Sequence, residues 1–151
     1  MRDEIRILSV DDFHANLVVI RSILSEAGSF EFLEASNGKE ALEVLSDTPD
    51  IDVVLLDLEM PVMNGIETLQ RIKGNENMRD IPVIVVSSKK SEVHKTLTLG
   101  ANDFISKPFD HEELKLRVLN QVKAKKLNDL SRDMSTILEA EVIKKTAFLQ
   151  D

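Results

Sequence analysis

The sequence predicts an open α/β fold in which helices cover both faces of a parallel sheet. Three short segments rich in β-branched residues are apolar nearly throughout, at 5–10, 52–57 and 82–87. Continuous apolar runs are typical of parallel strands that are buried on both faces, whereas half-exposed strands alternate. Helical spacings of apolar residues lie between these runs. This order requires crossover connections, which are right-handed, and therefore favours a parallel sheet.

Five strand–helix units are expected along the chain. Two weaker strand candidates, at 30–35 and 103–106, bring the number of strands to five. The first helix follows the first strand, and Gly28 ends its pattern. Its apolar residues repeat at helical spacing, at Leu17, Ile20, Ile23, Leu24 and Ala27.

Capping signals mark where three of the remaining helices begin. In each case an Asn or Asp is followed three residues later by Glu, a pattern in which the first side chain accepts hydrogen bonds from free backbone N–H groups. The three pairs are Asn37 with Glu40, Asn64 with Glu67, and Asp110 with Glu113. A short fourth helix is expected around Val93 and Leu97, and Gly100 closes it.

Composition limits the class of protein. The chain has 151 residues, no Cys, no Trp and no Tyr, and a net charge of −8. The absence of Cys excludes disulfide scaffolds and Cys-ligated metal sites, and the acidic balance argues against direct binding of nucleic acid. No apolar run reaches the roughly 18 residues that a membrane span needs, and no signal peptide fits the acidic N-terminus. We therefore expect a cytoplasmic protein without membrane contact.

The composition changes near residue 122. Residues 1–122 hold 13 Lys and Arg against 22 Asp and Glu, whereas residues 123–151 hold 6 against 5 and contain no Pro or Gly. We expect a globular domain at 1–122 and a continuous helical extension at 123–151, with a frayed tail as the alternative. Apolar residues of this extension step by three and four, as in a coiled-coil seam, at Leu127, Leu130, Met134 and Ile137, before the pattern drifts to Leu138 and Val142. The seam suggests a parallel dimer, and the alternative is a monomer with a solvated helix.

Polar side chains follow four of the five predicted strands. They are Asp11 and Asp12 after the first strand, Asp57 after the third, Ser87 and Ser88 after the fourth, and Lys107 with Pro108 after the fifth. In open α/β sheets, sites form beyond the carboxyl ends of the strands. Each element alone has a simpler interpretation, such as a helix cap, a turn or a loop. Their joint occurrence at successive strand ends favours a functional site.

The chemistry of these groups points to phosphoryl transfer. Neighbouring carboxylates repel one another, and a divalent cation relieves that repulsion. Mg²⁺ binds one or two carboxylates together with water and phosphate oxygens. A metal that bridges carboxylate and phosphate promotes attack by another carboxylate on phosphorus. A lysine and a hydroxyl would hold the remaining phosphoryl oxygens.

Four motifs resemble those of receiver domains of two-component response regulators. They are Val10-Asp11-Asp12, the segment at 56–65 around Asp57, Val86-Ser87-Ser88, and the segment at 100–109 that ends in Lys107-Pro108-Phe109. Together they extend the resemblance over residues 4–122. The resemblance implies a flavodoxin-like, doubly wound sheet of five parallel strands in the order 2-1-3-4-5 with five helices, the last of them extended.

The resemblance also implies a phosphorylation site. Asp57 would be the phosphoacceptor and would take its phosphoryl group from the phosphohistidine of a sensor histidine kinase or phosphotransfer protein. Mg²⁺ (or Mn²⁺) would be bound by the side chains of Asp12 and Asp57 and by the backbone carbonyl of Glu59, with Asp11 assisting.

Four further residues take roles by the same resemblance. Lys107 would contact the phosphoryl group, and Ser87 would reorient to bind it. Phe104 would be the aromatic residue whose rotamer reports that shift. The bond between Lys107 and Pro108 is expected to be cis.

Glu59 and Lys89 occupy positions that tune phosphate hydrolysis in the family. One hypothesis is that they pair across the mouth of the site and hinder the attacking water. The alternative is two independent solvated side chains, since exposed ion pairs are weak.

Two other functions compete with the phosphorylated switch. Haloacid dehalogenase-type phosphatases also use an Asp nucleophile with Mg²⁺, but they need a second Asp two residues later, where this chain has Glu59. The other is a receiver-like interaction module that is not phosphorylated, against which the complete acidic site argues.

The helical extension suggests which kind of output domain the receiver would control. Residues 137–147 resemble the signalling helix that precedes cyclic-di-nucleotide phosphodiesterase (HD-GYP) domains, and diguanylate cyclase outputs are an alternative. We expect an output domain C-terminal to the tail and no enzymatic activity beyond self-phosphorylation and dephosphorylation. We also expect a homodimer through the fourth helix, fifth strand and fifth helix, or through the tail.

Overall fold

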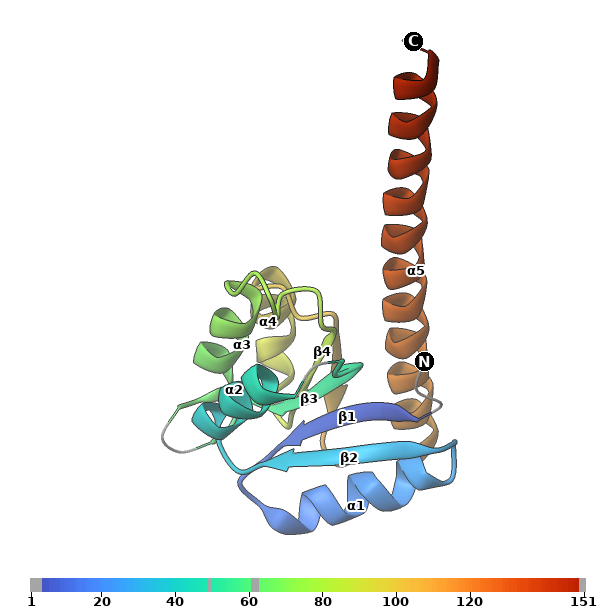
Figure 1. Cartoon of the computed structure of the whole chain (residues 1–151). Helices are drawn as coiled ribbons and strands as arrows, with labels where there is room; N and C mark the ends of the chain where they lie inside the picture. The colour runs from blue at the N-terminus through green and yellow to red at the C-terminus, as the bar shows by residue number, and fades with distance from the viewer. Residues whose placement is uncertain (1–3, 49, 61–62, 150–151) are drawn as a thin grey trace.

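A five-stranded parallel sheet forms the centre of the protein (Figure 1). The computed structural model describes residues 4–48, 50–60 and 63–149, with side chains as far as residue 130. The strand order is β2-β1-β3-β4-β5, as the resemblance implied. The strands are β1 (Ile5–Val10), β2 (Phe30–Ala35), β3 (Val53–Asp57), β4 (Val83–Ser87) and β5 (Asp103–Ser106).

Helices lie on both faces of the sheet. They are α1 (His14–Ser25), α2 (Gly38–Asp47), α3 (Gly65–Lys73), α4 (Val93–Thr98) and α5 (His111–Leu149), with a short 3₁₀ turn, η1 (Lys90–Glu92), before α4. Among the described helices, none combines the length and apolar character needed to cross a membrane.

Alternate residues of the central strands face two separate hydrophobic clusters. On one face, Leu8, Val54 and Leu56 pack with residues of α2 and α3. On the other face, Ile7 and Leu55 pack with residues of α1 and α5. Every residue of β3 and β4 is buried. This burial explains why the two strands are continuously apolar in the sequence.

The predicted capping residues fix the starts of three helices. The side chain of Asn37 accepts a hydrogen bond from the backbone N–H of Glu40, and Asn64 accepts one from Glu67. Asp110 accepts the equivalent bond from Glu113 at the start of α5. These bonds satisfy N–H groups that lack partners within the helix.

The last helix continues far beyond the sheet, as the sequence predicted. The first part of α5 contacts α1, β3 and β5, and the helix then rises clear of the other elements toward the C-terminus (Figure 1). The side chains of four predicted seam residues lie outside the described part of the chain: Met134, Ile137, Leu138 and Val142. Pro61 and Val62 of the motif at 56–65 also lie outside it.

Candidate functional site

The register of the parallel strands brings the predicted site residues to one edge of the sheet. Val10 pairs with Leu56, so Asp11 and Asp57 follow on neighbouring strands. Asp57 pairs with Val86, the residue before Ser87. Ser87 in turn pairs with Ser106, the residue before Lys107. The carboxyl ends of β1, β3, β4 and β5 therefore all contribute polar groups to the same site.

Asp57 is the buried centre of this site. Its side chain is 3% exposed. Its Oδ1 accepts a hydrogen bond from Nζ of Lys107 at 3.1 Å and another from the backbone N–H of Glu59 at 3.2 Å. No donor among the described residues contacts Oδ2. One oxygen is thus held in place, and the other is open to a ligand.

The charge of Asp57 is costly in this environment. Burial raises its pKa from 3.8 to about 6, and repulsion from Asp11 adds to the shift. The backbone N–H of Glu59 and the ammonium group of Lys107 oppose the rise and do not cancel it. A cation bound beside Asp57 would favour its ionised form, which is the nucleophilic one.

Asp11 is equally buried, and both of its oxygens are occupied. Oδ1 accepts from the backbone N–H of Phe13 at 2.9 Å, and Oδ2 accepts from the side-chain amide of Asn16 at 3.0 Å. Nζ of Lys107 lies 3.8 Å from Oδ2. The cap interpretation of this acidic pair does not hold, because α1 is capped at Phe13 without a side-chain hydrogen bond.

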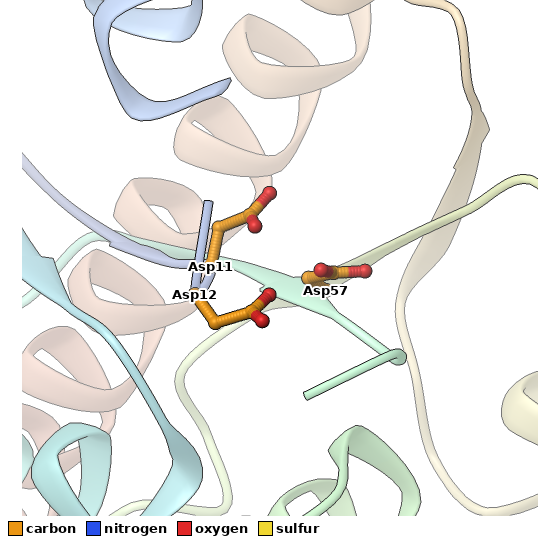
Figure 2. A group of neighbouring side chains, drawn as sticks. All are labelled: Asp11, Asp12 and Asp57. Carbon is orange, nitrogen blue, oxygen red and sulfur yellow. The ribbon is translucent and has the colours of Figure 1, made fainter. Parts of the chain in front are cut away.

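Asp12 completes an acidic cluster that suits a hard cation. One carboxylate oxygen from each of Asp11, Asp12 and Asp57 lies within 4.8 Å of the other two, and Figure 2 shows all three side chains gathered at the ends of β1 and β3. Asp12 is exposed, and its carboxylate has no hydrogen-bond donor among the described residues. One exposed and two buried carboxylates form an all-oxygen donor set, which fits Mg²⁺.

Glu59 contacts serine side chains at the mouth of the site. Its Oε1 accepts hydrogen bonds from Ser87 at 3.2 Å and from Ser88 at 3.3 Å. Ser87 Oγ also accepts from the backbone N–H of Lys89. Among the described residues, no ion pair joins Glu59 to Lys89. The Glu59 carboxylate thus contacts the hydroxyl groups of Ser87 and Ser88 and does not pair with the ammonium group of Lys89.

Gly65 holds the loop between β3 and α3 close to the site. A Cβ atom at this position would lie 2.5 Å from the backbone oxygen of Asp57 and 2.4 Å from Cα of Leu58. Its backbone N–H donates to the carbonyl of Leu58 at 3.1 Å. Only glycine permits this approach, which fixes the backbone just before Glu59.

The remaining predicted residues lie close by. Phe104 is buried in β5, in the cluster that packs against α2 and α3. The bond between Lys107 and Pro108 is cis, as expected from the resemblance. The structure thus brings Ser87, Lys107 and the acidic cluster together.

Two polar contacts of the site were missed at the level of sequence. Asn16, which donates to Asp11, lies five residues further along the chain in the first turn of α1. Ser88 was named among the polar residues at the strand ends but was given no role, and it donates to Glu59. The spacing between Asp11 and the first turn of α1 was the available signal for Asn16, whereas nothing in the pattern indicates the orientation of Ser88.

Comparison with known proteins identifies the family. The family model of the response regulator receiver domain matches residues 7–119. The chain therefore belongs to the receiver domains of two-component response regulators. A receiver domain is a signalling module of such systems.

Relatives and solved structures agree with this assignment. The chain is 35% identical to a chemotaxis protein CheY homolog from Campylobacter jejuni over 112 residues, which cover 73% of this chain and 86% of that protein. It is 36% identical to a probable cyclic di-GMP phosphodiesterase from Vibrio cholerae over 145 residues, which cover 95% of this chain but 32% of that protein. The receiver domain of a sensor histidine kinase from Pseudomonas aeruginosa, solved with a magnesium ion coordinated in its active-site cleft, has a TM-score of 0.72. That domain is 26% identical, and the match covers 80% of this chain and 98% of that one.

Proposed function

We propose that the chain is a phosphorylation-controlled switch and that Asp57 is its phosphoacceptor. The observation that carries this proposal is the asymmetry of the Asp57 carboxylate. Oδ1 is held by Lys107 and by the backbone N–H of Glu59, whereas Oδ2 has no hydrogen-bond donor among the described residues. A buried carboxylate with one fixed and one free oxygen is oriented for attack on phosphorus.

The proposed step transfers one phosphoryl group. Oδ2 of Asp57 forms a bond to phosphorus while the bond from phosphorus to a histidine nitrogen of the donor breaks. The donor imidazole carries a proton on its other ring nitrogen, so it takes the electron pair of the broken bond and leaves as neutral imidazole. With a small acyl phosphate as donor, the leaving group is the carboxylate. Lys107 lies beside the acceptor and would offer positive charge to the transferred oxygens.

A divalent cation would be held by the side chains of Asp12 and Asp57 and by the backbone carbonyl of Glu59. When bound, Mg²⁺ would neutralise negative charge on the carboxylates and the incoming phosphoryl oxygens. Mn²⁺, which also prefers oxygen ligands, is an expected substitute. The donor set supports this assignment, because Asp12 is exposed and has no competing hydrogen-bond donor among the described residues.

The switch would act through Ser87. Its hydroxyl donates to Glu59 and lies at the end of β4, beside the acceptor strand. Phosphorylation would draw this hydroxyl toward the phosphoryl group, and Phe104 in the neighbouring strand β5 would follow. The result would be a shift between two conformations at the surface of α4, β5 and α5. Glu59 and Lys89 would tune the lifetime of the phosphate.

The extension would connect the switch to an output. We assign residues 1–122 to the receiver and residues 123–151 to a helical linker. The match to the Vibrio cholerae protein supports a link to cyclic di-GMP turnover, because it extends over 95% of this chain and thus into the extension. A sensor histidine kinase or phosphotransfer protein would be the donor. A homodimer through α4, β5 and α5, or through the extension, would be the form that signals.

Intact mass after incubation with Mg²⁺ and acetyl phosphate tests the proposal. We expect a mass gain of one phosphoryl group in the native chain and none in Asp57→Asn. Asp110→Asn, which changes the carboxylate that caps α5 and is not part of the acidic cluster, serves as the matched control and should gain the group normally. A gain that persists in Asp57→Asn would contradict the assignment. Magnesium binding without any mass gain from acetyl phosphate or a kinase would favour the interaction module.

Release of phosphate distinguishes a switch from a phosphatase. A dehalogenase-type enzyme would hydrolyse added phosphate monoesters over many turnovers. The proposed switch would release only the phosphate it had taken up from an activated donor. Glu59 directs its carboxylate at two serines, which does not match the general acid that a phosphatase needs at this position.

A further inference from the structure

Asn16 is the one side-chain amide that contacts the acidic cluster in the described part of the chain. Its Nδ2 donates to Oδ2 of Asp11 at 3.0 Å. The same oxygen lies 3.8 Å from Nζ of Lys107, which is too far for a hydrogen bond. Among the described residues, Asn16 is therefore the hydrogen-bond donor to Oδ2 of Asp11.

We propose that Asn16 is a positioning residue of the magnesium site. It acts through Asp11, which it holds in place from the first turn of α1, and it does not itself contact the metal. This inference rests on the proposed function, because it concerns the cation that the acidic cluster would bind.

The two hydrogen bonds to Asp11 fix the plane of its carboxylate. The backbone N–H of Phe13 holds Oδ1, and the amide of Asn16 holds Oδ2. The two carboxylates that would bind the cation directly differ from Asp11, since Asp12 and Oδ2 of Asp57 have no donors among the described residues. Asp11 is thus a fixed negative charge beside two open ligands. In metal sites, groups that hydrogen-bond to a ligand orient it and support metal binding.

The chemical nature of Asn16 suits this role. A neutral amide satisfies the buried oxygen without cancelling the negative charge that attracts a cation. Without Asn16, the nearest remaining donor to Oδ2 of Asp11 would be Lys107. A shift of that ammonium group toward Asp11 would draw it away from Asp57, to which it now donates at 3.1 Å. Asn16 therefore also keeps Lys107 on the acceptor residue.

Removing this amide should not weaken α1. Asn is a poorer helix former than Ala or Leu, so Asn16→Ala and Asn16→Leu both raise the intrinsic helix propensity of the first turn. Leu also approximates the volume of Asn without its polar atoms. A loss of metal affinity in both variants would therefore come from the missing donor, and neither a melted helix nor a cavity would explain it.

Isothermal titration calorimetry with MgCl₂ alone tests the inference on the full chain. Calorimetry is the suitable method because the sequence has no Trp or Tyr whose fluorescence would report binding. We expect Asn16→Ala and Asn16→Leu each to weaken magnesium binding about tenfold, the lower end of the effect of losing a group that orients a metal ligand. Val18→Ala, at an exposed position of the same helix, should bind magnesium like the native chain.

A second readout separates positioning from chemistry. In the acetyl phosphate reaction, the half-saturating magnesium concentration should rise about tenfold in both Asn16 variants, matching the loss of affinity, while the rate at saturating magnesium stays near the native value. Native affinity in either Asn16 variant would overturn the inference, and so would an equal loss in Val18→Ala. A native chain that does not bind magnesium would also overturn it. Because calorimetry requires no phosphoryl transfer, failure of the phosphorylation test would be distinguishable from failure of this inference.

Discussion

The two parts of α5 differ in what covers their apolar side chains. In the first part, Leu114, Val118 and Val122 are buried against the sheet, and Leu114 is 0% exposed. In the second part, Leu127 and Leu130 are 67% and 55% exposed. Both parts belong to one continuous helix that runs from His111 to Leu149. The same helix thus begins in the core of the domain and continues into a segment in which Leu127 and Leu130 are exposed.

This difference shows that helix formation and packing are set by different features of the sequence. The extension has the residue types and spacing of a helix, but helices without tertiary support are marginal in water. The receiver part instead buries one stripe at a spacing of four residues, and this stripe belongs to the same hydrophobic cluster as residues of β1, β3, β4 and β5. We infer that the receiver stabilises its site on its own, whereas the extension depends on a partner surface.

Truncating a leucine in each part should give the largest contrast. Leu114→Ala removes a fully buried side chain and should lower the free energy of unfolding by about 2–5 kcal/mol. Leu127→Ala makes the same chemical change at an exposed position of the same helix and should change it by less than about 0.5 kcal/mol in the monomer. Chemical denaturation at low protein concentration measures both. Equal losses would mean that the extension packs against the domain.

Removing the charge of Asp57 should stabilise the receiver part at neutral pH. Its pKa is about 6 in the folded chain, against the ordinary value of 3.8, so the folded state binds more protons between these values. The free energy of unfolding of the native chain therefore falls as the pH rises through that window. Asp57→Asn removes this penalty and should be more stable by about 3 kcal/mol at pH 7.5 without divalent cations.

The pH dependence provides the control for Asp57→Asn. Below about pH 3.8 the carboxyl group is protonated in both states, so the advantage of the variant should disappear there. Urea denaturation at a series of pH values, in the presence of a chelator, measures this difference. An advantage that is constant with pH would show that the burial of charge is not its cause.

Helix caps should have a smaller effect, again confined to the receiver part. Asn64 accepts a hydrogen bond from the backbone N–H of Glu67 at 2.9 Å at the start of α3. Asn64→Ala should lower the free energy of unfolding by about 1 kcal/mol. Lys126→Ala, in the exposed extension, serves as the comparison and should stay within about 0.5 kcal/mol of the native chain. Thermal unfolding followed by circular dichroism measures both; a larger loss in Lys126→Ala would contradict the comparison.

The sequence predicted most of what is set by burial and local capping. The continuously apolar strands indicated a parallel sheet because both of its faces are covered, and the three capping pairs marked helix starts that the structure confirms. Contacts that depend on side-chain orientation were not predictable in this way. Asn16 reaches Asp11 only because the turn after β1 places the first turn of α1 beside the strand end. Glu59 contacts Ser87 and Ser88, whereas the sequence alone left open whether its side chain pairs with Lys89 or is solvated.

Amide hydrogen exchange along α5 tests the central contrast most directly. We expect strong protection through about residue 122, where the helix packs on the sheet, and rapid exchange from about residue 126 onward in the dilute monomer. Protection of the extension should rise with protein concentration if a second copy covers it. Uniform strong protection from His111 to Leu149 in the dilute monomer would contradict the account, because it would require the extension to be stabilised within a single chain.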